Sequence, residues 1–257
     1  MRIIQVKQNT AEWIEARKGR ITGSTAKSAI FDTYKRDAGK VKNLTLDFWQ
    51  LLADRLKDQS IDDATSPDPE VRGHELENLN ASITIDDLNA GLMSKDLKPL
   101  DADMEPGLWV SSDSEYIAVS PDVCEDSNKP TWAIECKSLA SARHLSVVVP
   151  WILHEQGSDG VWDSPWGTYK FPLPDDPLDY VPNDYQDQCL QYFVVNTDLQ
   201  VLYFSLYDPS ITDSRLAHVY ITITRTSVQD RIKEQRMKLN RTLGLVDLIE
   251  SKFPIQL

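Results

Sequence analysis

The stretch YIAVSPDVCEDSNKPTWAIECK, residues 116–137, predicts a β-hairpin with charged side chains on one face. Two apolar runs flank a turn-forming centre. The midpoint between Asp122 and Glu135 falls at Asn128, inside this turn. A symmetric hairpin therefore places the two carboxylates opposite each other, with Cβ atoms on the order of 5 Å apart. Lys137 follows Glu135 by two residues and shares its face of the strand.

These charged residues predict a metal site. Mg²⁺ binds oxygen ligands at about 2.0–2.1 Å, commonly one or two carboxylates together with substrate phosphate. Asp122 and Glu135 can share one ion, and Lys137 can orient an attacking water and offset charge on phosphorus. The alternative is a surface hairpin with scattered charges, because a bare Asp…Glu-x-Lys pattern is common by chance. The apolar neighbours Trp132 and Ile134 favour the metal site, since charged residues on such a strand need a reason to be half-buried.

The sequence around the hairpin predicts a mixed arrangement of helices and strands. Helical spacing covers 11–18, 44–58, 70–88, 184–195 and 227–250, and strand-like runs cover 108–110, 116–119, 131–137, 201–207 and 217–223. This order predicts one α/β domain of α+β type over 1–257, with a mixed central β-sheet flanked by helices. The proline-rich segment 147–182 has three tryptophans and little periodicity, and is predicted to be an inserted, family-variable loop.

Composition excludes several classes of protein. The chain has 257 residues, of which 41% are hydrophobic and 26% are charged, as in a folded globular protein. No stretch approaches the ~20 apolar residues of a membrane span, and the N-terminus is too polar for a secretory signal. Cys124, Cys136 and Cys189 lack metal-ligand spacing, so we expect reduced thiols in a cytoplasmic protein.

The net charge of −13, taken alone, argues against a nucleic-acid partner, because phosphate binding usually leaves a basic footprint. The charge is uneven, since residues 225–241 carry six basic and two acidic side chains. Such a helix face is most often simply solvated. A carboxylate metal site itself concentrates acid, so the charge lowers the expected affinity for DNA without excluding the chemistry.

The chain resembles the lambda-exonuclease-like, YqaJ-type viral recombinases among the PD-(D/E)XK nucleases. The resemblance rests on six short motifs that occur in family order over residues 13–209. They are Trp13-x3-Arg17-x-Gly19-x-Ile21-Thr22-Gly23-Ser24, Gly73-His-Glu-Leu-Glu77-Asn78, Ser120-Pro121-Asp122, Glu135-Cys136-Lys137, Tyr185-x2-Gln188-x2-Gln191 and Tyr207-Asp208-Pro209. Each motif is weak, but the ordered set is specific.

The resemblance implies a PD-(D/E)XK core and a role for each matching residue. Asp122 and Glu135 would hold the metal, with the backbone carbonyl of Cys136 as a further ligand. Glu77 would reach a second metal or its water, and Lys137 would assist the attacking water. The implied cofactor is Mg²⁺, with two ions per site, although oxygen ligands suit Mn²⁺ as well.

The resemblance also implies a pocket for a terminal 5′ phosphate, formed by Arg17, Ser24, Ser120 and Gln188. An Arg guanidinium grips phosphate bidentately, and hydroxyl and amide groups complete the donors. Three residues are less certain members of the site. Glu75 competes with Glu77, Gln191 competes with Gln188, and Trp13 fits a core position better than a DNA contact.

The activity implied is stepwise hydrolysis of double-stranded DNA from an end, 5′ to 3′. Mononucleotides and a 3′ single-stranded overhang would result, and the overhang would pass to a single-strand annealing protein in phage-type recombination. The resemblance further implies a ring-shaped homo-oligomer in the cytoplasm of a bacterial host.

Three alternatives stay open. A restriction- or repair-type endonuclease on the same fold would cut closed circular DNA. A vestigial DNA-end-binding protein would bind without turnover, although the intact Asp122, Glu135 and Lys137 argue against it. An acidic protein that binds only protein partners would show no DNA affinity even at low salt.

Overall fold

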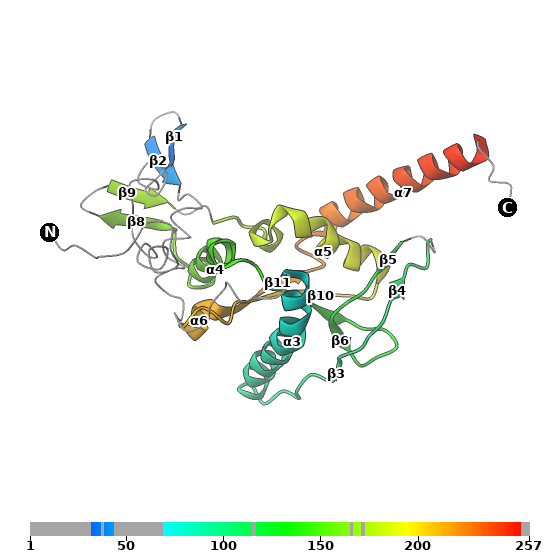
Figure 1. Cartoon of the computed structure of the whole chain (residues 1–257), viewed down its shortest axis with the longest axis horizontal. Coiled ribbons are helices and arrows are strands. Elements are labelled where there is room, and N and C mark those ends of the chain that lie inside the picture. The colour runs from blue at the N-terminus through cyan, green and yellow to red at the C-terminus, as the bar shows by residue number, and fades with distance from the viewer. Residues whose placement is uncertain are drawn as a thin grey trace, which may run out of the picture. The chain divides into compact units, whose positions relative to one another are not determined.

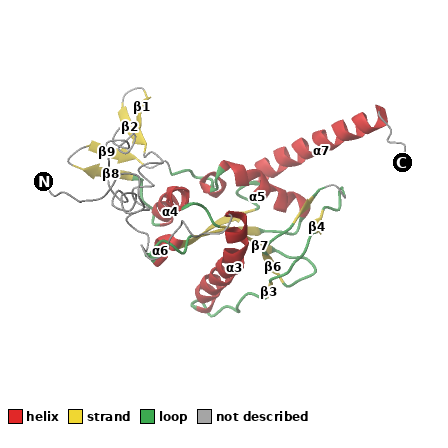
Figure 2. Ribbon diagram, viewed as in Figure 1, coloured by secondary structure: helices red, strands yellow, loops and turns green. Residues whose placement is uncertain are grey.

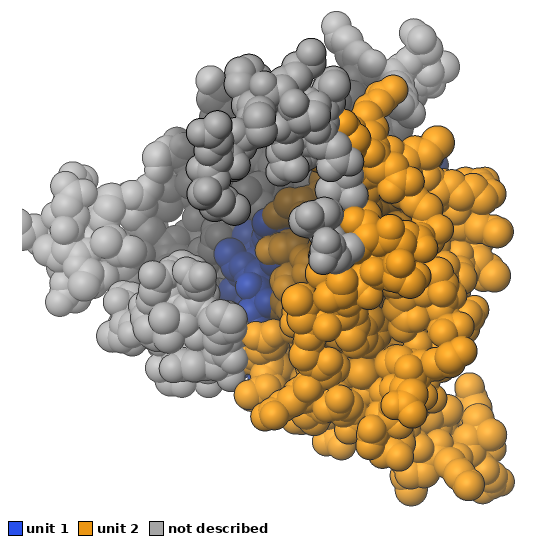
Figure 3. Space-filling model, turned by 90° about the vertical axis from the view of Figure 1, so that its right-hand side faces the viewer, with its two compact units in different colours: residues 1–74, 138–173, 206–219 blue, residues 75–137, 174–205, 220–257 orange. Residues whose placement is uncertain are grey.

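The computed structural model describes residues 32–36, 39–43, 69–114, 117–164, 167–170 and 173–252. The chain divides into two compact units (Figure 3). Unit 1 comprises residues 1–74, 138–173 and 206–219, and unit 2 comprises residues 75–137, 174–205 and 220–257. The prediction of a single domain over 1–257 stays a prediction. The helices expected at 11–18 and 44–58 lie outside the described residues.

A five-stranded sheet in the order β11-β10-β7-β6-β3 forms the centre of the fold. Its strands are β3 (Ala102–Asp103), β6 (Val123–Glu125), β7 (Trp132–Lys137), β10 (Val201–Tyr207) and β11 (His218–Thr224). The pairs β3–β6 and β6–β7 are antiparallel. Strands β7 and β10 begin side by side and run in the same direction, because the N–H groups of Gln200 and Val201 both donate to the Thr131 carbonyl. The sheet is therefore mixed, as predicted.

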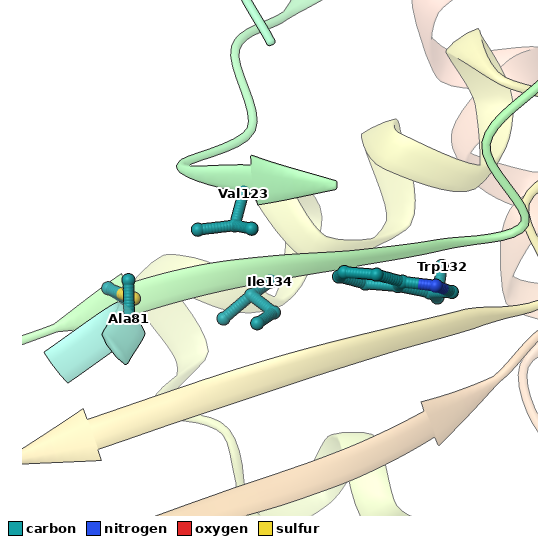
Figure 4. Packing of buried hydrophobic residues seen from close by; sticks show 5 residues of the cluster. Ala81, Val123, Trp132 and Ile134 are labelled. Atoms are coloured by element: carbon teal, nitrogen blue, oxygen red, sulfur yellow. The ribbon is translucent and has the colours of Figure 1, made fainter. Parts of the chain in front are cut away.

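Helix α3 (Pro69–Met93) covers one face of this sheet. Side chains of a strand alternate between faces, so Trp132, Ile134 and Cys136 of β7 point the same way and pack with Val123 and Ala81. Figure 4 shows Val123 and Ile134 side by side in this cluster. Burial of these apolar side chains drives the contact, because each contributes roughly 1.5–3 kcal/mol when removed from water.

A buried polar network adds directional contacts between α3 and β10. The Ser205 hydroxyl donates to Asn80 Oδ1 at 2.6 Å, and the Asn80 amide donates to the Ser205 carbonyl at 3.3 Å. The hydroxyls of Thr84 and Ser205 are 2.7 Å apart. Buried polar groups cost free energy unless they are hydrogen-bonded, so this network fixes how α3 lies on the strand.

Helix α5 (Asn183–Val195) lies on the opposite face of the sheet (Figure 2). The ring of Tyr185 packs against Phe204 of β10 at a centroid distance of 5.8 Å. Arg225 covers the end of α5, where its guanidinium donates to the carbonyls of Phe193, Asn196 and Leu199. Carbonyls at a helix C-terminus have no partner within the helix, so the arginine satisfies them.

Further elements of unit 2 pack around α5. Helix α7 (Gln229–Lys252) packs against α5 and continues toward the C-terminus (Figure 1). Its Arg231 donates to Asp176 and Asp179 of the segment around the 3₁₀-helix η2 (Pro177–Tyr180) and to Gln186 of α5. The hairpin β4 (Trp109–Val110) and β5 (Ala118–Val119) pairs Trp109 with Val119.

The prediction that 147–182 is a loop is wrong, because the described part of this segment contains a helix and two strands. Residues 147–155 belong to helix α4 (Ser141–Glu155), and β8 (Val161–Ser164) pairs with β9 (Gly167–Lys170). Pro150 lies inside α4, where it removes one backbone hydrogen bond. The helix persists because its apolar side packs on other residues of the unit. Whether 147–182 is a family-variable insertion stays a prediction.

The remaining elements of unit 1 are short. They are the hairpin β1 (Asp32–Arg36) and β2 (Gly39–Asn43), and helix α6 (Ser214–Ala217). Ala142 and Leu145 of α4 pack with Ile211 and Ala217, and the His144 imidazole bonds the Leu216 carbonyl at 2.7 Å. Among the described helices of both units, none is long and apolar enough to cross a membrane.

Candidate active site

The hairpin of β6 and β7 brings Asp122 and Glu135 close together. Val123 pairs with Ile134 and Cys124 with Ala133. Asp122 lies just before β6, where its N–H donates to the Ile134 carbonyl at 3.3 Å, and it is close enough to Glu135 for that charge to raise its pKa. The predicted register is therefore confirmed. Glu135 contacts Gln188 and Tyr192 of α5, whereas Asp122 reaches Glu77 of α3.

Glu135 is held by three hydrogen-bond donors. It is only 1% exposed, so its carboxylate depends on protein partners. Its Oε1 accepts from the Lys137 ammonium and, at 2.6 Å, from the Gln188 amide. Its Oε2 accepts from the Tyr192 hydroxyl, which also lies 2.9 Å from the Ser120 carbonyl oxygen. These bonds fix the orientation of the carboxylate.

Asp122 sits between a backbone donor and a second carboxyl group. The Cys136 N–H donates to Asp122 Oδ2 at 2.6 Å, and the Asp122 carboxyl shares a hydrogen bond with Glu77 of α3. Burial, that bond and the charge of Glu135 raise the pKa of Asp122 from 3.8 to about 9. Two carboxyl groups share a hydrogen bond only if one of them carries a proton, so the proton here offsets the repulsion among the three acids.

Lys137 is the cation of the cluster. Burial lowers the pKa of its ammonium, but the charge and hydrogen bond of Glu135 outweigh burial and raise it above 10.5. The amine therefore stays charged near neutral pH. It also lies 5.6 Å from the centroid of the Tyr185 ring, within the range of a cation–π contact.

A pocket of about 380 Å³ opens at these residues. Its lining includes Glu77, Ser120 and Asp122, together with Met104 and Gly107. Gly107 has a φ of +67°, a left-handed conformation that only glycine adopts without strain, so the chain can turn sharply at the rim. The pocket gives a ligand access to Glu77 and Asp122 from solvent.

The donor set fits a hard divalent cation such as Mg²⁺. Glu77, Asp122 and Glu135 supply carboxylate oxygens, which are the ligands that Mg²⁺ prefers. An ionised carboxylate has about four acceptor positions; donors to Glu135 occupy three, which leaves one on Oε2. Within the described residues, no three His, Cys, Asp or Glu side chains already form a metal-binding group. Loss of the proton shared by Asp122 and Glu77 would free both carboxylates to hold a cation.

The other predicted residues are placed as follows. Gln188 bonds Glu135, whereas Gln191 donates to the Ala118 carbonyl at 2.7 Å, so of the two glutamines only Gln188 contacts the acidic cluster. Ser120 is exposed and donates to the Gly107 carbonyl at 3.2 Å. Glu75 belongs to α3, but its side chain lies outside the description. Arg17, Ser24 and Trp13 lie outside the described residues, and the 5′-phosphate pocket stays a prediction.

Tyr192 contacts Glu135, and none of the sequence motifs singles it out. A signal was available, since Gln188 and Tyr192 are four residues apart on one helix and share a face. Helical spacing alone cannot show that this face meets Glu135, which is 57 residues away along the chain. The contact depends on the crossover from β7 to β10 through α5.

Comparison with known proteins gives the family. Two crystal structures of the alkaline exonuclease LHK-Exo from Laribacter hongkongensis are similar to the chain. One, in complex with dAMP, is 18% identical over 95% of this chain and 97% of that chain, with a TM-score of 0.43. The other is 17% identical over 95% and 100%, with a TM-score of 0.40. No curated protein matches. The model of the YqaJ-like viral recombinase domain matches residues 12–200, and the chain belongs to that family.

Proposed function

We propose that the protein is a metal-dependent deoxyribonuclease that digests double-stranded DNA from an end, 5′ to 3′. It releases mononucleotides and leaves a 3′ single-stranded overhang. The observation that carries the proposal is the cluster of Asp122 and Glu135 at the hairpin, in which Lys137 bonds Glu135 and Glu77 bonds Asp122. Family membership supports a DNA substrate.

The residues of the chain have distinct parts in the proposed reaction. A water attacks phosphorus in line with the leaving oxygen, so that a new P–O bond forms as the bond to that oxygen breaks. Lys137 orients the water and offsets the charge that develops on phosphorus. Gln188 and Tyr192 keep the Glu135 carboxylate in one orientation, so little reorganisation is needed during the reaction.

Asp122, Glu135 and Glu77 would hold Mg²⁺, with the carbonyl of Cys136 as a further ligand, and Mn²⁺ fits the same oxygen donors. When bound, the ions supply positive charge that stabilises both the attacking and the leaving oxygen. The backbone of Cys136 already touches Asp122 through its N–H, so the two groups are close enough to serve one site.

The finer parts of the proposal concern the DNA end and the partners. Arg17, Ser24, Ser120 and Gln188 would bind the terminal 5′ phosphate and so select ends over internal sites. The 3′ overhang would pass to a single-strand annealing protein in phage-type recombination. A ring-shaped homo-oligomer would keep the enzyme on its substrate in the cytoplasm of the host cell.

The test is digestion of linear, 5′-phosphorylated duplex beside covalently closed circular duplex. Each DNA is incubated with Mg²⁺ or with EDTA, using the wild type, Glu135→Gln, and Asp126→Asn as a matched control. Asp126 is an exposed carboxylate of the same hairpin that faces no member of the acidic cluster in the contacts described. We expect loss of linear DNA alone, only with Mg²⁺, with the wild type and Asp126→Asn.

Other outcomes select the alternatives. Cutting of the closed circle would favour an endonuclease on the same fold. Binding of ends at low salt without any cleavage would favour a DNA-end-binding protein whose site is vestigial. Replacing the 5′ phosphate by a 5′ hydroxyl should slow digestion if the terminal phosphate is bound, and equal rates would reject that part of the proposal.

A further inference from the structure

Tyr185 lies on the same face of α5 as the two residues that hold Glu135. Tyr185, Gln188 and Tyr192 follow one another at intervals of three and four residues, which places them on one side of the helix. Gln188 and Tyr192 both donate to the Glu135 carboxylate. The Lys137 ammonium lies over the Tyr185 ring, 5.6 Å from its centroid. One helix face therefore contacts both Glu135 and Lys137.

The Tyr185 ring is supported from the sheet. Phe204 of β10 is fully buried, and its ring centroid lies 5.8 Å from that of Tyr185 at an interplanar angle of 41°. The Tyr185 N–H donates to the Pro182 carbonyl at 2.8 Å, which fixes its backbone in the first turn of α5. The half-buried ring therefore offers the ammonium a surface that is already ordered, so the contact costs little further conformational entropy.

Lys137 depends on such a contact for its direction. A lysine ammonium is a compact charge on a flexible four-carbon stem, so a single ion pair leaves it several orientations. The side chain is 24% exposed, and its ion pair with Glu135 fixes one side of the ammonium. Among the described residues, no other carboxylate lies within 4.0 Å of it. The Tyr185 ring supplies a second point of attachment.

An aromatic contact holds the ammonium without neutralising it. The face of the ring attracts a cation through its quadrupole, but the ring carries no net charge. A second carboxylate at the same place would cancel the charge that Lys137 offers to the substrate. The ammonium has three N–H donors. Glu135 accepts from it, so donors stay available to a water or a phosphate oxygen.

We propose that Tyr185 is a positioning residue for Lys137, whose ring keeps the ammonium beside Glu135 in the direction that the attacking water requires. The inference rests on the proposed function, since Tyr185 acts through Lys137 in that reaction. The face of the ring carries the role, and the hydroxyl does not. A residue that only packed on Phe204 would depend on the shape of the ring and not on its electron density.

The test separates the electron density of the ring from its shape. Phenylalanine and its mono-, di- and trifluorinated analogues are placed at position 185, because each fluorine weakens the attraction of the ring for a cation while packing against Phe204 is nearly kept. Single-turnover cleavage and KM are measured on linear duplex with Mg²⁺. We expect Tyr185→Phe to stay within about twofold of wild type, and the rate to fall stepwise to about fivefold lower in the trifluorinated protein, with a smaller change in KM.

Two further variants complete the series. Tyr185→Leu removes the ring and should slow cleavage by about tenfold. Tyr203→Leu is the matched control, because Tyr203 packs edge-on against Tyr220 at 5.7 Å on the face that α3 covers, away from Lys137. It should stay within about twofold of wild type. Urea denaturation shows whether each variant is folded, and the fluorinated series decides the matter if Tyr185→Leu is not.

The outcomes distinguish this inference from the activity itself. Equal rates along the fluorinated series would show that Tyr185 acts by packing alone, and the positioning role would be rejected. A loss in Tyr185→Phe as large as that in Tyr185→Leu would assign the effect to the hydroxyl and reject it as well. Absence of cleavage by the wild type would instead reject the proposed function, and this inference with it.

Discussion

Glu135 is the residue on which most of the described contacts at the site converge. Lys137 comes from its own strand, while Gln188 and Tyr192 come from a helix more than 50 residues later in the chain. A hydrogen bond to a charged group contributes about 1.5–3 kcal/mol, and loss of one partner leaves the other buried without compensation. The orientation of Glu135 therefore depends on α5 as much as on its own strand.

Removing the Tyr192 hydroxyl tests this dependence. In Tyr192→Phe, we expect kcat to fall by about tenfold, which corresponds to roughly 1.4 kcal/mol, because one oxygen of Glu135 loses its donor. The KM for DNA should change less, since the hydroxyl faces the carboxylate. Single-turnover and steady-state rates would show the split. A variant with unchanged kcat would contradict the positioning role.

The raised pKa of Asp122 predicts how stability depends on pH when metal is removed. A carboxyl group whose pKa is higher in the folded than in the unfolded protein stabilises the fold fully below the unfolded value, and that stabilisation is lost as pH rises through the folded value. In EDTA, the unfolding midpoint should therefore fall as pH rises from 5 to 9, the range set by about 3.8 and about 9.

The matched variant is Asp122→Asn, which keeps the shape and removes the ionisation. Its midpoint should vary less over the same range, and Mg²⁺ should raise the wild-type midpoint most at high pH, where Asp122 is ionised. Thermal unfolding followed by circular dichroism measures both effects. An equal slope in wild type and Asp122→Asn would show that other groups set the pH dependence.

Among the secondary-structure elements, Arg225 connects the end of β11 to the end of α5 and to the turn before β10. Its guanidinium donates to carbonyls at the end of α5 and in the turn before β10, and lies 5.3 Å from the Phe193 ring centroid. Burial lowers its pKa, but the group stays charged at neutral pH. It fixes where α5 ends, and α5 carries Gln188 and Tyr192.

We expect Arg225→Ala to lower the free energy of unfolding by about 2–4 kcal/mol, because several buried carbonyls lose their donor at once. Arg225→Lys should recover only part of this, since an ammonium cannot span the same carbonyls. Lys233→Ala is the control, because Lys233 is exposed and pairs only with Asp230 in the contacts described; it should stay within about 0.5 kcal/mol. Urea denaturation measures all three, and equal losses for Arg225→Ala and Lys233→Ala would contradict the capping role.

The elements that sequence predicts well are those with strong local signals. The hairpin register followed from the turn at Asn128, and β10 follows an unbroken β-prone run. Helix α4 was missed because Pro150 and nearby prolines suggest a loop, whereas the apolar packing of Leu145 outweighs the lost hydrogen bond. The contact of Gln188 with Glu135 was also missed, because spacing within a helix does not specify which distant strand the helix covers.

At the scale of the whole molecule, the net charge of −13 opposes binding to a polyanion. In EDTA we expect weak binding to duplex ends and a shallow dependence on salt, because log K changes with log salt by about −0.9 per phosphate neutralised. Mg²⁺ should strengthen binding by adding positive charge among Glu77, Asp122 and Glu135. Fluorescence anisotropy of a labelled duplex, with Glu135→Gln to prevent cleavage, measures both. A steep salt dependence in EDTA would point to an extended basic surface instead.

The division of the chain into two units separates the contacts of Glu135 from residues 138–173. The chain leaves unit 2 after Lys137 and returns to it at Pro174, and the described partners of Glu135 all lie on the unit 2 side of that excursion. Residues 138–173 can therefore be exchanged without replacing a residue that contacts Glu135 in the structure. A chimera that carries another protein's segment between Lys137 and Pro174 would show whether the contacts of Glu135 form without this part of unit 1.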